Sequence, residues 1–285
     1  MYPRRQGDQA APPGADRRLT RTDDHRGDDP DDGGAVAGLA GRRMLVVGAS
    51  SGIGRAVALG AAGSGARVAV VARRLPLLEE VVAEAGATAR AFAGDVTDPS
   101  ALTRAVTDAT AWLGGLDAVV YATGMAPLAG LAATTAAQWQ RVLATNVVGA
   151  ALVASATLPH LRRPSAAGRG CVAVLSSHSV GDPWPGLGAY ATSKAALVEL
   201  ARALRAEEPE VRVLVVTVGD TATSFADQWD PRAANVALER WLADGHLRHE
   251  VLQPAEVATA ILDALAGGGP DELEVIGARV DGGPT

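Results

Sequence analysis

Tyr190 and Lys194 lie four residues apart, and this pair offers the most specific chemistry in the sequence. The apolar spacing of residues 195–204 predicts a helix, on which residues i and i+4 share one face. A free phenol titrates at about pH 10, too high for a base at neutral pH. A nearby ammonium group stabilises the phenolate and lowers the pKa, which would make the tyrosine a usable general acid/base.

Lys194 is the only lysine among the 26 basic residues of the chain; all the others are arginine. An ammonium group is a compact point charge, whereas a guanidinium group is a wide planar fork. The sequence therefore keeps a lysine where a compact charge is useful. The pair alone does not prove catalysis, because this spacing also arises by chance on helices.

The composition suits one large α/β domain with a core of Ala, Val and Leu, because hydrophobic residues make up 48% of the 285 residues and aromatic residues only 4%. The net charge of -6 argues against a nucleic-acid partner. The single cysteine, Cys171, suits a reducing compartment, so we expect the cytosol. No uninterrupted apolar run reaches the length of about 18 residues that spans a bilayer, and we expect neither membrane association nor a bound metal.

Residues 1–38 are predicted to be a disordered tail, because they are rich in Pro, Gly, Asp and Arg and poor in apolar residues. A regulatory or docking role of this tail is the alternative. Residues 39–285 are predicted to form a single dinucleotide-binding catalytic domain, with a flap at about 220–250. Phe225, Trp229 and Trp241 in the flap either close over a pocket or anchor a surface helix.

A glycine-rich loop follows the apolar strand expected at residues 44–47 and precedes a helix. This arrangement presents backbone N–H groups and the positive end of a helix to a phosphate. Glycines allow the sharp turn and the close approach of the ligand. The candidate residues for binding a dinucleotide are Gly48, Ser50, Ser51, Gly52, Ile53 and Gly54.

Arg73 and Arg74 follow the second expected strand, at residues 67–72, where many dinucleotide folds carry an acidic residue. A carboxylate would repel a 2′-phosphate, whereas a guanidinium group binds it with two hydrogen bonds. We therefore predict NADP(H) as the cofactor, with Arg73 as the principal contact and Arg74 or Ser51 as secondary contacts. The alternative is a pair of solvated arginines at the start of a helix.

Further strands are expected at 89–93, 118–121, 170–175, 211–218 and 273–276, alternating with helices that include 136–162 and 256–266. This alternation predicts a doubly wound parallel sheet of the Rossmann type. Asp95 follows the third strand and is a candidate for contacting adenine, while Asp98 before Pro99 resembles a helix cap. Asn146 is a poor interior residue for the helix expected at 136–162, so it is either a satisfied core group or part of a polar site.

Together these motifs resemble the short-chain dehydrogenase/reductase family over roughly residues 42–226 and 280–283. The matching pieces are GASSGIG, Asp95-Val96, NVVG at 146–149, Ser177, YATSK at 190–194 and VGDTAT at 218–223. The resemblance implies the strand order 3-2-1-4-5-6-7 in a single domain. It also implies homodimers or homotetramers formed through the helices that carry Asn146 and Tyr190.

The resemblance also implies a role for each residue of a tetrad. Tyr190 would exchange the proton, Lys194 would lower its pKa and bind the nicotinamide ribose, Ser177 would orient the carbonyl, and Asn146 would hold a proton-relay water. The implied cofactor contacts beyond the glycine loop and the arginines are Asp95, Val96, Ala122, Gly124, Tyr190, Lys194, Gly219, Thr221 and Thr223. Tyr121 departs from the family pattern, which has Asn there; it either reaches the pocket or packs beside the sheet.

The expected function is therefore NADP(H)-dependent hydride transfer between the nicotinamide and a ketone or secondary alcohol. The alternative is a non-catalytic member that senses NADP(H) or a metabolite. A sensor has no need of the tyrosine–lysine pair, so the intact tetrad favours the enzyme.

Overall fold

The computed structural model describes residues 36–163 and 168–279 of the chain. The predicted tail therefore lies almost entirely outside the described residues, as does the 280–283 match. The core is a parallel sheet with the strand order β3-β2-β1-β4-β5-β6-β7, which confirms the predicted topology. The strands are β1 (Arg43–Val47), β2 (Arg67–Ala72), β3 (Ala89–Ala93), β4 (Ala118–Tyr121), β5 (Cys171–Ser177), β6 (Arg212–Val218) and β7 (Glu272–Val275).

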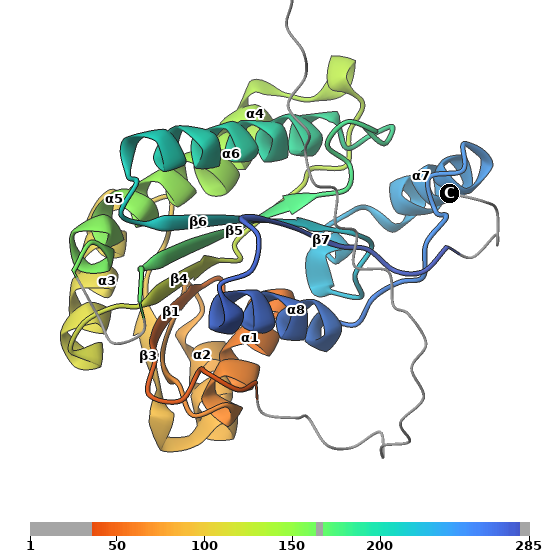
Figure 1. Ribbon diagram of the computed structural model, residues 1–285. Helices are drawn as coiled ribbons and strands as arrows, with labels where there is room; N and C mark the ends of the chain where they lie inside the picture. The colour runs from red at the N-terminus through yellow and green to blue at the C-terminus, as the bar shows by residue number, and fades with distance from the viewer. Residues whose placement is uncertain (1–35, 164–167, 280–285) are drawn as a thin grey trace, which may run out of the picture.

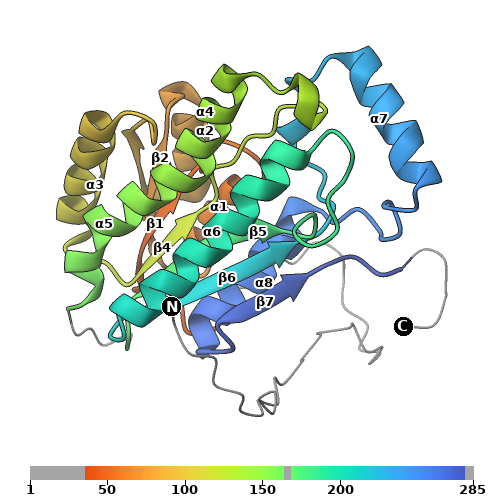
Figure 2. The same cartoon turned by 90° about the horizontal axis from the view of Figure 1, so that it is seen from above.

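Helices cover both faces of the sheet (Figure 1), and the view from above shows the same layers (Figure 2). α1, α2 and α8 lie on one face, while α3, α5 and α6 lie on the other. α7 stands apart from these layers, beyond the carboxyl ends of the central strands. The helices are α1 (Gly52–Gly63), α2 (Leu75–Ala85), α3 (Pro99–Leu113), α4 (Ala136–Leu143), α5 (Gly149–Leu161), α6 (Gly188–Glu207), α7 (Pro231–Ala243) and α8 (Pro254–Gly267).

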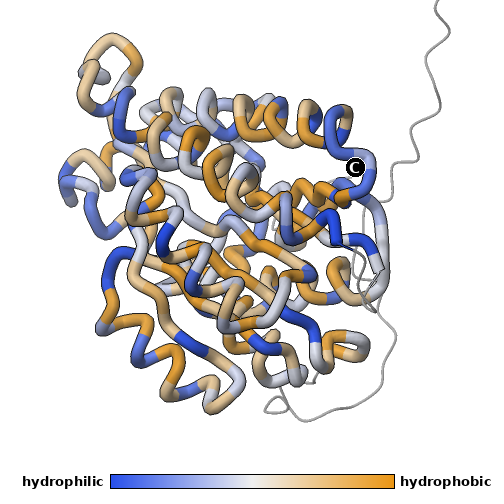
Figure 3. Tube along the Cα trace, turned by 90° about the vertical axis from the view of Figure 1, so that its left-hand side faces the viewer, coloured by the Kyte–Doolittle hydropathy of each residue, from blue (hydrophilic) through white to orange (hydrophobic). Residues whose placement is uncertain are grey.

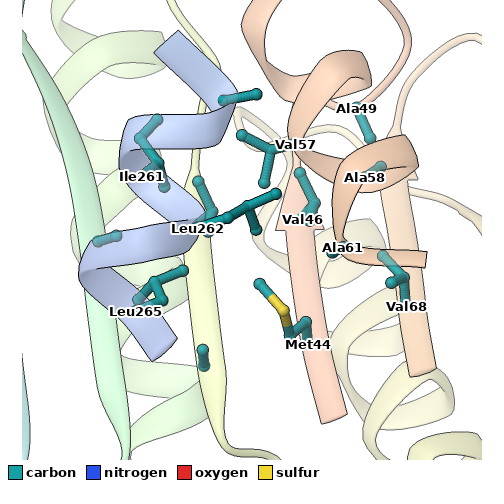
Figure 4. Packing of buried hydrophobic residues seen from close by; sticks show 14 of the residues in the cluster. Met44, Val46, Ala49, Val57, Ala58, Ala61, Val68, Ile261, Leu262 and Leu265 are labelled. Atoms are coloured by element: carbon teal, nitrogen blue, oxygen red, sulfur yellow. The ribbon is translucent and has the colours of Figure 1, made fainter. Parts of the chain in front are cut away.

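Each central strand contributes side chains to two cores, because alternate residues face opposite sides of a sheet. In β1, Met44 and Val46 face α1 and α8, while Leu45 and Val47 face α3 and α5. Figure 4 shows the first core, in which the small side chains of α1 allow Leu262 of α8 to approach closely. Along the helices hydrophobic and hydrophilic residues alternate, as expected for helices with one face on the sheet (Figure 3).

Two helices begin with the same Asp-Pro pair. The Asp98 side chain accepts from the backbone N–H groups of Ser100 and Ala101 at the start of α3. The Asp230 side chain caps α7 in the same way. A capping carboxylate satisfies N–H groups that lack partners in the first turn, so the predicted structural role of Asp98 is confirmed.

The helix expected at 136–162 is interrupted. A π-helical segment, η3 (Ala144–Val148), separates α4 from α5. Asn146 lies in this segment, and its amide bonds to a neighbouring loop instead of pointing to solvent. The wider turn places a polar side chain toward the sheet edge, and π segments of this kind are frequent at functional sites.

The helical stretch Ala136–Leu161 is long and apolar enough to cross a membrane by length and composition, with a mean hydropathy of 1.6 over its best window. The stretch is not an uninterrupted apolar run of the kind considered in the sequence, because polar residues such as Arg141 and Asn146 interrupt it. In the fold 44% of that window is buried, and α5 packs against α3 and β4. Core helices of soluble proteins meet the same criterion.

Candidate active site

A cavity of about 980 Å³ opens at the carboxyl edge of the sheet. Its walls come from the loop after β1, from the ends of β2 to β6, from the first turns of α6 and from the segment 219–251. Every predicted site residue lines this cavity except Gly54 and Asn146. This is the crevice in which doubly wound sheets bind their ligands.

The glycine loop has the geometry of a phosphate cradle. Gly48 has φ +91°, and a Cβ there would lie 2.7 Å from the backbone nitrogen of Thr123. Gly54 packs directly on the backbone of Gly48, which explains why it is needed although it does not line the cavity. The first turn of α1 carries no acidic residue, and the Ser51 side chain makes no cap hydrogen bond. The N-terminus of α1 is therefore suited to an anion, and these residues fit a dinucleotide.

Both predicted arginines line the cavity beside this loop and are exposed. Arg74 donates to Ser50 Oγ at 3.2 Å, which ties the guanidinium group to the glycine loop. Ala72 is the last residue of β2 and is followed directly by Arg73 and Arg74, so no carboxylate occupies the end of this strand. The site that would hold a ribose 2′ substituent is therefore positively charged.

Asp95 and Val96 line the cavity beyond β3. The Asp95 carboxylate accepts from both the backbone N–H and the hydroxyl of Thr97, at 2.9 and 2.7 Å through Oδ1. These two bonds hold the carboxylate in one orientation and leave Oδ2 for another donor. An adenine amino group is a suitable donor, so the predicted contact is compatible with the structure.

Tyr190 and Lys194 both lie in α6 and both line the cavity. The Lys194 Nζ atom is 5.6 Å from the centre of the Tyr190 ring, so the two side chains share one face of the helix. Lys194 is only 4% exposed, and its ammonium group donates to the carbonyl oxygen of Leu175 at 2.8 Å. A lysine has three donors, so two remain for other partners.

The pKa values of the pair differ from the expectation. Burial raises the pKa of Tyr190 to about 12, although hydrogen bonding with Ser177 acts in the opposite direction. Burial also lowers the pKa of Lys194 to about 8. The net shift of the Tyr190 pKa is therefore upward, opposite to the predicted lowering, because burial disfavours the phenolate.

Ser177 is the last residue of β5 and lies beside Tyr190 at the cavity wall. Its Oγ accepts a hydrogen bond from the backbone N–H of Ser179 at 3.2 Å and lies 3.0 Å from Ser179 Oγ. The structure thus brings Ser177, Tyr190 and Lys194 to one place. Ser179 was not expected there, and its only signal in the sequence is its position two residues after Ser177.

Asn146 lies behind the cavity wall and is completely buried. Its Oδ1 accepts from Met125 N at 2.9 Å, and its Nδ2 donates to Met125 O at 2.9 Å and to Ser193 Oγ at 2.8 Å. Both side-chain N–H donors are therefore occupied, so the side chain has no donor left for the predicted relay water. The observed role of the side chain is to hold the loop after β4 against α6.

Tyr121 packs beside the sheet and is 1% exposed, so it does not reach the cavity. Its hydroxyl donates to the carbonyl oxygen of Thr145 in the π-helical segment. A Cβ on Gly149 would lie 2.6 Å from this hydroxyl, so the glycine makes room for it. The tyrosine thus takes the place of the family's asparagine and braces the segment that carries Asn146.

Gly219, Thr221 and Thr223 line the cavity opposite the glycine loop. Thr221 Oγ1 donates to Gly219 O at 3.0 Å, and Thr223 Oγ1 accepts from Phe225 N at 3.3 Å. The methyl group of Thr223 also lies near Gly52, 3.2 Å from where a Cβ would be. The segment after β6 therefore reaches the start of α1 and narrows the cavity between them.

Aromatic rings connect the cavity with α7. Ring centres are 5.2 Å apart for Tyr190 and Phe225, 6.0 Å for Phe225 and Trp229, and 6.0 Å for Trp229 and Trp241. Trp229 Nε1 donates to Ala126 O and Trp241 Nε1 donates to Pro185 O, both at 2.8 Å. These aromatics therefore line the cavity and anchor a surface helix, α7, whereas closure of this segment over the pocket stays a prediction.

Residues 42–234 match the family model for short chain dehydrogenases. The chain belongs to the short-chain dehydrogenase/reductase family. A short chain dehydrogenase from Pseudocercospora fijiensis is 38% identical over 234 residues, covering 79% of this chain and 74% of that protein. Glycine betaine reductase ATRR of Emericella nidulans is 35% identical over 233 residues, which cover 80% of this chain but only 18% of that protein.

Solved structures of the short-chain dehydrogenase/reductase family show the same fold. A short-chain dehydrogenase from Streptomyces avermitilis is 32% identical, covers 83% of this chain and 89% of its own, and gives a TM-score of 0.71. A 3-ketoacyl-(acyl-carrier-protein) reductase from Brucella melitensis complexed with NADH is 25% identical, covers 85% of this chain and 99% of its own, and gives 0.73. This short-chain dehydrogenase/reductase is therefore an oxidoreductase that uses a nicotinamide cofactor.

Proposed function

We propose that this oxidoreductase transfers hydride between NADP(H) and a ketone or secondary alcohol. The observation that carries the proposal is the meeting of Ser177, Tyr190 and Lys194 in one cavity with the glycine loop and two arginines. The relatives' names point to different substrates, so they support the reaction type and not one compound.

The preference for NADP(H) rests on the charges after β2. Arg73 and Arg74 line the cavity, and Arg74 also contacts Ser50. Guanidinium groups bind a phosphate with two hydrogen bonds. The carboxylate that would bind a free 2′-hydroxyl is absent from the end of β2. Among the solved structures, an alcohol dehydrogenase from Thermococcus sibiricus is complexed with 5-hydroxy-NADP and is 25% identical over 86% of this chain.

In the proposed mechanism the bound nicotinamide supplies or accepts the hydride, and this chain's residues handle the proton. Tyr190 has a pKa of about 12, so it is protonated at neutral pH and can donate its proton to a carbonyl oxygen. Ser177 hydrogen-bonds the same oxygen and limits the charge that develops on it. Lys194, with two donors free beside Leu175, binds the ribose and places an ammonium group near the tyrosinate that remains.

A homodimer or homotetramer formed through the helices that carry Asn146 and Tyr190 belongs to the same proposal. The segment 136–161 is apolar, yet less than half of its best window is buried within one chain. Val148 in this segment is 51% exposed. Light scattering coupled to size-exclusion chromatography measures the mass in solution, and a monomer at micromolar concentration would contradict this part.

The alternative function is a sensor that binds NADP(H) without turnover, and one experiment distinguishes it from the enzyme. The purified protein is incubated with NADPH and a panel of ketones, and the loss of absorbance at about 340 nm is followed. We expect oxidation of NADPH with several members of the panel. Binding of NADPH without oxidation by any member would favour the sensor.

A further inference from the structure

The hydroxyl group of Ser179 lies against the hydroxyl group that the proposed reaction uses. After β5 the chain turns, with Val180 N donating to Ser177 O at 3.0 Å and His178 N donating to Val218 O at 2.9 Å. Within this turn Ser179 N donates to Ser177 Oγ at 3.2 Å, and the two serine oxygens are 3.0 Å apart. Ser179 is 5% exposed, while Ser177 is half-buried, and both line the cavity.

Either serine could donate in the bond between the two hydroxyls, and the inventory of hydrogen bonds shows what each direction would leave for other partners. A serine hydroxyl has one donor and two acceptor sites. One acceptor site of Ser177 is already used by the backbone N–H of Ser179. If Ser177 donated its only hydrogen to Ser179, none would remain for the phenol or for a substrate oxygen. If Ser179 donates instead, both acceptor sites of Ser177 are filled and its hydrogen is directed elsewhere.

The second arrangement agrees with the neighbouring phenol. Ser177 and Tyr190 lie together at the cavity wall, and hydrogen bonding with Ser177 lowers the pKa of Tyr190 against the effect of burial, as a bond donated to the phenol oxygen would. A hydroxyl that accepts hydrogen bonds is also a stronger donor, because bonds in a chain polarise one another. The order Ser179 to Ser177 to the phenol oxygen is therefore consistent in direction.

We propose that Ser179 is a positioning residue, whose hydroxyl donates to Ser177 Oγ and directs the Ser177 hydrogen toward the oxygen at which the proton is exchanged. The inference rests on the proposed function only where it speaks of turnover. The hydrogen-bond chain itself ends at Tyr190 and is testable without a substrate.

A substitution at Ser179 removes none of the charged or titratable side chains around Tyr190. Lys194 lies on the same helix, His178 lies on the turn after β5, and Asp220 and Asp227 line the cavity from the segment after β6. A change in the behaviour of Tyr190 on removal of the Ser179 hydroxyl is therefore attributable to the serine pair.

The first test compares the kinetics of Ser179→Ala, Ser179→Thr and Ser176→Ala. Ser176 is an adjacent buried serine whose hydroxyl has no hydrogen-bond partner among the described residues, so it is the matched control. We expect Ser179→Ala to lower kcat about tenfold with KM changed less than about twofold, since one hydrogen bond in the chain is lost. Ser179→Thr restores kcat, and Ser176→Ala leaves it unchanged.

The second test needs no turnover. The chain has three tyrosines, so 13Cζ-labelled tyrosine gives few NMR signals, and Tyr190→Phe assigns one of them. We expect Ser177→Ala and Ser179→Ala to move the Tyr190 signal in the same direction, and Ser179→Ala to add nothing in the Ser177→Ala background. A Tyr190 signal that Ser179→Ala leaves in place would overturn the inference.

The two tests separate the possible failures. If none of the carbonyl compounds tested causes the wild-type protein to oxidise NADPH, the proposed function fails. The NMR result still decides the role of Ser179 in that case. If turnover is found but Ser179→Ala lowers kcat and Thr does not restore it, the residue supports the fold only and the inference fails.

Discussion

The two halves of the cavity are built by different means. The half formed by β1, α1 and β2 uses backbone groups, with Gly48 and Gly54 packed against one another and a helix N-terminus free of acidic residues. The half formed by α6, α7 and the segment after β6 uses side chains. The rings of Phe225, Trp229 and Trp241 form a series of contacts that begins at Tyr190.

The difference has a physical reason. The nicotinamide dinucleotides share one pyrophosphate group, so a fixed backbone shape that depends on a few glycines serves them all. A substrate pocket made of side chains is altered by substitution without disturbing the sheet. The first half therefore carries recognisable sequence motifs, whereas the second carries only an unusual density of aromatic residues.

The largest effect is expected where the two halves meet. Tyr190→Phe removes the proton donor, and we expect kcat to fall about a thousandfold or more. The cofactor half does not depend on this hydroxyl, so NADPH binding, measured by fluorescence titration, should change less than about threefold. Activity within tenfold of the wild type would refute the assignment of Tyr190.

Arg73→Ala tests the cofactor half. The loss of a charge-assisted hydrogen bond costs about 1.5–3 kcal/mol, so we expect KM for NADPH to rise roughly 10- to 100-fold while KM for NADH changes little. Arg74→Ala should act in the same direction, because Arg74 also contacts the glycine loop. Arg90→Ala is the control, since Arg90 lies over Phe92 and does not line the cavity. Equal effects on the two cofactors would reject the 2′-phosphate role.

Lys194→Met tests how far the buried ammonium group lowers the free energy of unfolding of the protein. The lysine has a pKa of about 8 in the folded protein, below its ordinary value of about 10.5. The unfolded chain therefore binds more protons between these values, so the stability of the wild type rises with pH from about 8 to about 10.5. Below pH 8 the buried ammonium group lowers the free energy of unfolding of the wild type by about 3 kcal/mol.

The variant lacks this destabilisation but also loses the hydrogen bond to Leu175, worth about 1 kcal/mol. We therefore expect Lys194→Met to be about 2 kcal/mol more stable than the wild type at pH 7, and this advantage to shrink between pH 8 and pH 10.5. Urea unfolding at several pH values measures it. A variant that is less stable at pH 7 would show that the ammonium group is better solvated than its burial indicates.

The smallest effect comes from the two Asp-Pro helix starts, one in the central layers and one in the half of the cavity built from side chains. Asp98→Ala removes the cap of α3 in the central layers, and we expect a loss of about 1 kcal/mol in the free energy of unfolding. Asp230→Ala removes the same cap from α7, which lies outside the layers. We expect less effect on global unfolding there and faster hydrogen exchange in α7. Equal losses of global stability would show that α7 unfolds together with the sheet.

The sheet was predictable because its central strands, β1, β2, β4, β5 and β6, are rich in Val, Ala and Leu and mostly buried. β2, β3 and β4 have the bounds expected from the sequence, and the other strands agree within one or two residues. Most of the predicted site residues do line the cavity, because the carboxyl ends of parallel strands meet at one edge.

The rest depends on contacts that the sequence does not encode locally. The π-helical segment around Asn146 is fixed by a tyrosine and a methionine backbone that lie about twenty residues away in the chain. The pKa of Tyr190 follows from burial, which is a property of the whole fold. The bounds of α7 were not predicted and a surface helix in this segment was only one of two interpretations, although Asp230 before Pro231 gives the same start signal as Asp98 before Pro99.

The aromatic series beside the cavity has a practical consequence. Three of the five tryptophans, Trp184, Trp229 and Trp241, lie along this wall, and ring centres of Trp184 and Trp241 are 5.2 Å apart. Indole emission overlaps the absorption of a reduced nicotinamide, so energy transfer from these rings reports on a dinucleotide in the crevice. The native protein thus contains its own optical reporter, concentrated on the wall of the cavity that is built from side chains.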